Sequence, residues 1–123
     1  MEKDYTYYKD KSIRESKSII PKLHALMSQK IGPDNSLTIE KLVEIFGVSE
    51  RVIRLALRDL VRYYGLPIVA LPNENGGSQG YFVAAEGKHV NRYVKSLRMR
   101  RQSIDRRIRD IEEAYSQYVM VAA

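Results

Sequence analysis

Apolar side chains recur every three or four residues in four segments of the chain, the spacing that places them on one face of an α-helix. These segments cover residues 18–30, 38–46, 50–64 and 87–118. Residues that stop a helix follow the first three segments, namely Gly32 with Pro33, then Gly47, then Gly65. Glycine fits the left-handed position that closes many helices, and proline cannot continue one. The pattern therefore predicts three short helices followed by a long one.

The second and third predicted helices are joined by a very short connection. Thr38 and Ser49 precede the two helices, and each hydroxyl can accept a hydrogen bond from an amide of the first turn. Glu50 opens the third helix with a negative charge, which the helix dipole favours. Val48 lies between Gly47 and Ser49, and we expect it to be buried at the turn. These residues predict two helices packed around a tight turn.

Two short apolar runs follow the third helix, at residues 66–71 and 81–83, and neither has helical spacing. Between them, residues 72–80 are rich in glycine and asparagine, which favour turns. Two apolar runs around such a segment predict a β-hairpin with a long loop. The predicted fold class is therefore mainly α with a small β-hairpin, followed by a long C-terminal helix.

The third predicted helix has an apolar face and a basic face. Its basic face is formed by Arg51, Arg54, Arg58 and Arg62, and its apolar face by Ile53, Leu57, Leu60 and Tyr64. At ~100° of rotation per residue, the other three arginines fall within roughly 60° of Arg51. Guanidinium groups can bind the O6 and N7 edge of guanine or bridge phosphates. The alternative is a solvated face, on which Arg58 and Arg62 pair with Asp59 or Glu44.

Four short motifs follow one another between residues 37 and 85. They are TIEKL at the start of the second helix, FGVS at the turn, VIRLALRDL in the third helix, and GLPI with GYFV in the hairpin. In this order they resemble the winged helix-turn-helix DNA-binding domains of bacterial regulators and of small phage-encoded DNA-binding proteins. The resemblance covers roughly residues 18–85. It implies binding to double-stranded DNA, with the third helix in the major groove.

Candidate DNA contacts follow from this placement of the third helix. Its first residues would lie deepest in the groove, and the candidates for base contact are Ser49, Glu50, Arg51, Arg54 and Leu55. Arg58 and Arg62 lie further along the helix and are candidates for phosphate contact. The resemblance also implies contacts from the hairpin loop, by Asn75, Ser78 and Gln79. No lysine or arginine occurs between Ala70 and Glu86, so a loop that makes no DNA contact is the alternative.

The long C-terminal helix carries an apolar seam, a line of side chains with alternating spacings of four and three residues. The seam comprises Val90, Val94, Leu97, Arg101, Ile104, Ile108, Ile111, Tyr115 and Tyr118. It spans about 43 Å at ~1.5 Å per residue, more than one small domain covers. We therefore expect the helix to join two copies of the chain in a homodimer, with Arg101 fixing the register. Packing against the first helix of the same chain, or against an unrelated protein, are the alternatives.

The chain is basic, with a formal net charge of +6 and an isoelectric point near 9.6. Such a surplus favours an anionic partner, above all a nucleic acid. Part of the positive charge lies on the C-terminal helix, where it either faces solvent or contacts phosphates. Lys88, Arg92 and Lys95 lie nearest the hairpin along the chain, and we expect these three to assist DNA binding.

The composition excludes several kinds of site. The 123 residues contain no cysteine, which rules out disulfides and thiolate zinc ligands. His24 and His89 lie in different segments, and no catalytic or nucleotide-binding motif occurs. We expect no enzymatic activity, no metal, no cofactor and no small-molecule ligand. Apolar runs too short to span a membrane, and an N-terminus without a secretory core, favour a cytoplasmic protein.

The expected organisation is a flexible arm over residues 1–17, a winged helix-turn-helix domain over 18–86 and a dimerisation helix over 87–123. An arm that is partly helical from Ser12 is the alternative for the first segment. The first hypothesis for function is a dimeric transcriptional regulator that binds specific DNA sequences. A phage replication or origin-binding accessory protein is the second. A winged-helix protein-interaction module without DNA binding is the third, because a fold alone does not determine what it binds.

Overall fold

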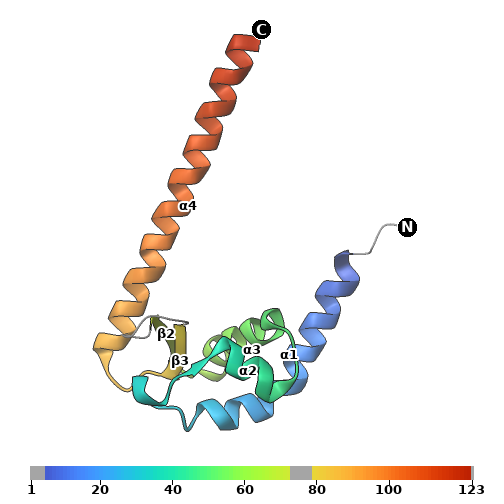
Figure 1. Ribbon diagram of the computed structural model, residues 1–123, viewed down its shortest axis with the longest axis vertical. Helices are drawn as coiled ribbons and strands as arrows, with labels where there is room; N and C mark the ends of the chain where they lie inside the picture. Colours follow the sequence, from blue (N-terminus) through green and yellow to red (C-terminus); the bar gives the residue numbers. More distant parts are fainter. Residues whose placement is uncertain (1–4, 73–78, 123) are drawn as a thin grey trace. The chain divides into compact units, whose positions relative to one another are not determined.

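The helices and strands follow the predicted order along the chain (Figure 1). The computed structural model describes residues 5–72 and 79–122. Its elements are α1 (Tyr5–Met27), the short 3-10 helix η1 (Pro33–Asn35), β1 (Leu37–Thr38), α2 (Ile39–Phe46), α3 (Glu50–Tyr64), β2 (Ile68–Pro72), β3 (Gln79–Val83) and α4 (Gly87–Ala122). The predicted fold class, mainly α with a small β-hairpin and a long C-terminal helix, is confirmed.

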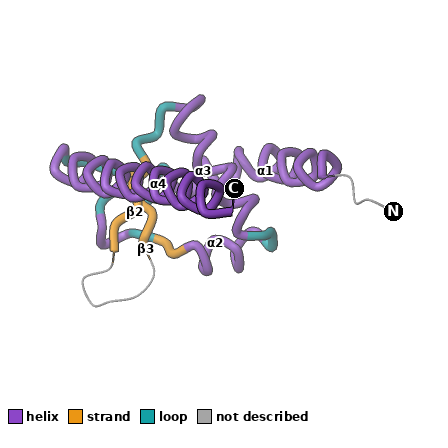
Figure 2. The backbone as a smooth tube through the Cα atoms, turned by 90° about the horizontal axis from the view of Figure 1, so that it is seen from above, coloured by secondary structure: helices purple, strands orange, loops and turns teal. Residues whose placement is uncertain are grey.

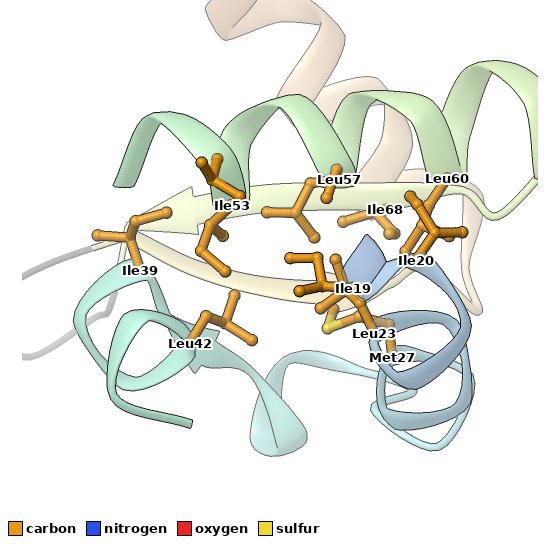
Figure 3. Close-up of a cluster of buried hydrophobic side chains, with 12 residues drawn as sticks. Ile19, Ile20, Leu23, Met27, Ile39, Leu42, Ile53, Leu57, Leu60 and Ile68 are labelled. Atoms are coloured by element: carbon orange, nitrogen blue, oxygen red, sulfur yellow. The ribbon is translucent and has the colours of Figure 1, made fainter. Parts of the chain in front are cut away.

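The apolar faces of α1, α2 and α3 meet in one core (Figure 3). The side chains of Ile53, Leu57 and Leu60 lie on the inner face of α3, toward Leu23 of α1 and Leu42 of α2. Leu23, Leu42, Ile53 and Leu60 have no exposed surface. Full burial of such a side chain contributes about 1.5–3 kcal/mol to folding. This core fixes which face of α3 turns inward and therefore which face remains at the surface.

The turn between α2 and α3 forms as the sequence predicts. The hydroxyls of Thr38 and Ser49 each accept a hydrogen bond at 3.2 Å from the amide three residues further along the chain. Gly47 closes α2 with φ of 65°, and Gly65 closes α3 with φ of 70°. Both values lie in the left-handed region that glycine adopts without steric cost. The caps therefore set both ends of α3.

The predicted hairpin belongs to a three-stranded antiparallel sheet with the order β1-β3-β2. β2 and β3 run side by side (Figure 2), with Ile68 opposite Val83 and Pro72 opposite Gln79. β2 begins at Ile68 rather than at Leu66, where the predicted run starts. β1 was not predicted, because its two residues become a strand only by pairing with β3.

Gly80 of β3 lies close to the loop that precedes β1. A β-carbon built at this position would lie 2.6 Å from the Cβ atom of Ser36. That separation is far shorter than the ~3.5–4.0 Å at which carbon atoms attract one another. The close approach of this loop to β3 therefore requires glycine at position 80.

The start of α1 differs from the prediction. The helix begins at Tyr5 instead of near Ser18, so residues 5–17, assigned above to a flexible arm, are helical. Pro21, which was expected in the opening turn, consequently lies inside the helix. Proline has no amide hydrogen, so one backbone hydrogen bond of α1 is missing at this point. Packing of the helix against α3 offsets this loss.

Ser16 explains why the sequence pattern does not reveal this part of α1. Its side chain is buried at 1% exposure, although serine does not count as apolar in a periodicity analysis. The hydroxyl donates a hydrogen bond at 2.7 Å to the carbonyl of Ile13, so burial does not leave it unsatisfied. A small polar residue thus occupies a position on the helix face that an apolar residue would have marked.

α4 is one uninterrupted helix of 36 residues (Figures 1 and 2). It begins at Gly87, as predicted, and continues to Ala122, beyond the predicted end near Tyr118. The chain divides into two units, Met1–Val90 and Asn91–Ala123, so the first turn of α4 belongs to the first unit. No helix within the described part of the chain has the length and apolar content to cross a membrane.

Candidate nucleic-acid interface

The basic face of α3 lies at the surface, as the sequence predicts. Arg51, Arg54, Arg58 and Arg62 are exposed, whereas Val52, Ile53, Ala56, Leu57 and Leu60 of the same helix are buried. Leu55 is half-buried at the border between the two faces. We call the four arginines the arginine row. It extends about 16 Å along the helix, at ~1.5 Å per residue.

Two members of the arginine row pair with acids of the same helix. The Arg54 guanidinium lies 3.2 Å from the Glu50 carboxylate, and the Arg58 guanidinium lies 3.5 Å from the Asp59 carboxylate. The side chains of Arg54 and Glu50 are 57% and 52% exposed, and that of Asp59 is 16% exposed. The exposed pair of Arg54 with Glu50 is weak, about 0–1 kcal/mol, so a stronger anion can displace the acid. Asp59 is largely buried, so its pair with Arg58 is not of this exposed kind.

The other two arginines have no acidic partner among the described residues. Arg62 lies over the ring of Tyr63, 5.5 Å from the ring centroid, which is a cation–π distance. Glu44, the alternative partner considered for Arg62, pairs with Lys41 at 3.8 Å instead. The alternative of an internally paired basic face therefore applies only to Arg54 and Arg58. The charge of Arg51 is available to a ligand.

The beginning of α3 adds polar groups beside the arginine row. The Ser49 hydroxyl accepts the capping hydrogen bond, and its own hydrogen can be donated to a phosphate or base oxygen. The Glu50 carboxylate is exposed at the same end, and carboxylates can accept a hydrogen bond from the amino group of cytosine. Donors and an acceptor thus lie together within one turn, which is a suitable set for distinguishing base edges.

Only part of the predicted hairpin contact lies in the described structure. Gln79 is exposed at the start of β3, opposite Pro72. Asn75 and Ser78, the other two candidates, lie outside the described residues. Gln79 offers an amide with both a donor and an acceptor, which can bind a sugar or phosphate without contributing charge.

Tyr64 does not lie in the core, which corrects the prediction made from helical periodicity. It is 55% exposed, and its ring packs on the ring of His24 with centroids 5.6 Å apart. Tyr63, which the sequence analysis did not single out, is 68% exposed. Both tyrosines lie at the end of α3, where Gly65 turns the chain away and less structure covers the helix. Its position directly after Arg62 in the sequence could have identified Tyr63 as an aromatic neighbour of the arginine row.

α4 carries the apolar seam at its surface. The exposed fractions are 36% for Val90, 41% for Leu97, 52% for Ile104, 51% for Ile108, 67% for Ile111 and 69% for Tyr115. Val94 is half-buried, and Arg101 is exposed. An apolar line with this exposure, interrupted only by Arg101, is typical of a surface that another polypeptide covers.

Within residues 5–72 and 79–122, no three histidine or carboxylate side chains come together as a metal site would require. Comparisons of the chain with known protein families, with curated proteins and with solved structures find no match. Inferences about function therefore depend on the geometry of α3 and of the apolar seam.

Proposed function

We propose that this protein binds specific sequences of double-stranded DNA as a homodimer and acts in the cytoplasm as a transcriptional regulator. The observation that carries the proposal is the outward arginine row on α3. This row lies on the second of two helices joined by the short turn Gly47-Val48-Ser49, and the β2–β3 hairpin follows. The order of elements supports the resemblance of the sequence motifs to winged helix-turn-helix domains. In helix-turn-helix proteins the second helix enters the major groove.

The dimensions of α3 suit this role. The major groove of B-DNA is about 12 Å wide and admits one α-helix. With the start of α3 in the groove, Ser49, Glu50, Arg51, Arg54 and Leu55 face the base edges. Arg58 and Arg62 then face the phosphates that border the groove. Base contacts supply specificity, and phosphate contacts supply affinity that decreases as salt is added.

Displacement of Glu50 from Arg54 is consistent with this mechanism. Both side chains are more than half exposed, and the carboxylate is held by a single contact at 3.2 Å. A bidentate hydrogen bond from arginine to guanine contributes about 1–3 kcal/mol to discrimination, more than such a pair contributes to stability. DNA can therefore compete successfully for the Arg54 guanidinium.

A salt titration of DNA affinity tests the proposal. The test variant combines Arg51→Ala with Arg54→Ala, and the matched control combines Arg14→Ala with Lys22→Ala, which removes two exposed cations from α1 instead. Binding to a fluorescent random-sequence duplex is measured by anisotropy at several salt concentrations. The logarithm of the association constant should fall linearly with the logarithm of salt, by ~0.9 for each phosphate contact.

The test variant should bind at least about tenfold more weakly than the control at low salt, because two groove-facing cations are lost. Selection of bound fragments from a random pool should enrich one sequence motif with the unchanged protein and lose that enrichment with the test variant. Equal binding by the two variants would refute the role of α3. Affinity that does not change with salt, or no affinity for DNA, would refute the proposal as a whole.

A further inference from the structure

Charged residues border the apolar seam of α4 in a regular arrangement. In heptad notation, Val94, Arg101, Ile108 and Tyr115 occupy position a, and Val90, Leu97, Ile104, Ile111 and Tyr118 occupy position d. The bordering g positions hold Tyr93, Arg100, Arg107 and Ala114, and the bordering e positions hold Arg98, Asp105, Glu112 and Val119. Arginines thus occupy the central g positions and acids the central e positions. Side chains at e and g determine partner and orientation in coiled coils.

We propose that α4 pairs with α4 of a second copy as a parallel, in-register, two-stranded coiled coil. In this arrangement each g residue meets the next e residue of the other helix. Arg100 then faces Asp105 of the second copy, and Arg107 faces Glu112. Two-fold symmetry repeats both pairs, so every charged g–e contact in the centre of the coiled coil is attractive.

The g–e pairs at the two ends of the coiled coil are also compatible. Toward the start of α4, Tyr93 faces Arg98 of the second copy, and an arginine can stack on an aromatic ring. Toward the end, Ala114 faces Val119, which is 43% exposed in the single chain and would become covered. Beyond the last charged pair, the facing g and e residues are thus both apolar.

The four central charges are available for contacts with another chain. Arg100, Asp105, Arg107 and Glu112 are all exposed. Within the described part of the chain, none of them forms an ion pair. Pairing with a second copy therefore requires no contact within the chain to be broken.

An antiparallel arrangement brings like charges together. Antiparallel helices place g residues opposite g residues and e residues opposite e residues. One alignment that keeps most of the seam overlapped puts Arg100 against Arg107 of the second copy and Arg98 against Asp105, so repulsion offsets attraction. The neighbouring alignment puts Arg107 against Arg107 and Asp105 against Asp105, which offsets the attraction between Arg98 and Glu112. The charged g–e pairs of the parallel arrangement are all attractive. The border charges therefore favour the parallel arrangement.

Arg101 favours two strands over three. Isoleucine at both a and d positions, as at Ile104 and Ile108, shifts coiled coils toward three or more strands. Three strands would direct three Arg101 side chains toward one closed axis. In a two-stranded coil, each arginine can extend its stem along the seam and keep its charged end in water. One charged a position thus limits the number of strands.

This inference rests on the homodimer of the proposed function and adds its orientation. Because α4 follows directly after β3 in the chain, a parallel coil attaches both copies of residues 5–86 to the same end. Two α3 helices can then reach neighbouring half-sites on one DNA duplex. Helices joined antiparallel would attach these residues to opposite ends of a coil about 50 Å long, at ~1.5 Å per residue.

Cysteine cross-linking tests the orientation, because the natural chain contains no cysteine. Leu97→Cys places one thiol at a d position and Ile108→Cys places one at an a position, and Met99→Cys places one on the outer face as the matched control. In a parallel, in-register dimer each seam cysteine faces the same cysteine of the second copy. Both variants should therefore form disulfide-linked dimers under mild oxidation. The control should remain largely unlinked, because a disulfide requires Cα atoms within about 7 Å.

The inference is wrong if Leu97→Cys and Ile108→Cys cross-link only when the two variants are mixed, because Leu97 faces Ile108 in the antiparallel alignment that puts Arg100 against Arg107. That result would indicate antiparallel helices while leaving the dimer and its DNA binding intact. If sedimentation of the unmodified chain gives the monomer mass of 14.2 kDa, the dimer itself is wrong. If it gives three times that mass, the coil is not two-stranded. The salt titration described above reports DNA binding independently of all three results.

Charge reversal tests the g–e pairs. Arg100→Glu with Arg107→Glu should raise the dimer dissociation constant about tenfold or more, because four attractive pairs become repulsive. Arg106→Glu with Arg109→Glu makes the same change in net charge away from the seam and serves as the control. Asp105→Arg with Glu112→Arg should also weaken its own dimer, and an equal mixture of the two seam variants should dimerise again. An effect as large in the control, or no recovery in the mixture, would refute the pairing.

Discussion

Glu50 holds Arg54, one of the arginines proposed to face the DNA groove, so its removal should improve DNA binding while it destabilises the fold. The Glu50 carboxylate lies 3.2 Å from the Arg54 guanidinium and within the first turn of α3. Glu50→Gln removes the negative charge and keeps the shape of the side chain. Arg54 is then free, and a charge that repels phosphate is lost.

The magnitude follows from the exposure of the pair. Two unit charges 3.2 Å apart in water attract by about 1.3 kcal/mol. Both side chains are more than half exposed, and measured pairs of this kind contribute only about 0.2–1 kcal/mol. Release of Arg54 should therefore strengthen binding to random-sequence DNA about 1.4- to fivefold at low salt. Loss of the favourable interaction between Glu50 and the helix dipole should lower the free energy of unfolding by about 0.3–1 kcal/mol.

Two measurements on the same variant separate these effects. Anisotropy with a random-sequence duplex gives the affinity, and urea denaturation gives the free energy of unfolding. Glu44→Gln is the matched control, because it releases Lys41 from a similar exposed pair on α2 rather than on α3. The control should leave DNA affinity nearly unchanged. Unchanged or weaker DNA binding by Glu50→Gln would refute the competition between Glu50 and DNA for Arg54.

Three further substitutions test the fold and the dimer. Leu23→Ala should lower the free energy of unfolding by about 2–5 kcal/mol in urea denaturation, and a loss below ~1 kcal/mol would contradict full burial of Leu23. Gly80→Ala should cost about 1–3 kcal/mol through its clash with Ser36, whereas Gly87→Ala, where a β-carbon meets nothing within 4 Å, should cost nothing. Arg101→Leu should lower the dimer dissociation constant about tenfold or more and allow trimers to form in sedimentation experiments, and an unchanged constant would place Arg101 outside the interface.

Local signals allowed most of the fold to be predicted. Thr38, Gly47, Ser49 and Gly65 act within a few residues of their own positions, and all four cap helices as predicted. β1 could not be predicted, because a two-residue strand is defined only by its partner β3, which is distant in sequence. The first part of α1 was missed for a related reason. Its buried face includes Ser16, whose role depends on packing that the sequence does not reveal.

The candidate interface, like the fold, was predicted only in part. Helical rotation was enough to predict that the arginine row faces solvent. The choice of partners within the row depends on side-chain conformation, so the pairing of Arg54 with Glu50 was not foreseen. Tyr64 was misplaced because rotation gives its direction but not the extent of the structure that covers it. Its 55% exposure reflects the end of α3 at Gly65.

The partial neutralisation of α3 gives the proposed dimer a physical purpose. One copy offers four arginines, two of which already hold acids of the same helix, and its β2 and β3 strands carry no lysine or arginine. Such a surface should bind a single half-site only weakly, since affinity for DNA rises with the number of phosphates neutralised. A parallel coil keeps the second α3 near the same duplex, and the second contact then forms at a high effective concentration. Under the proposed function, α4 therefore supplies much of the affinity, and α3 supplies the specificity.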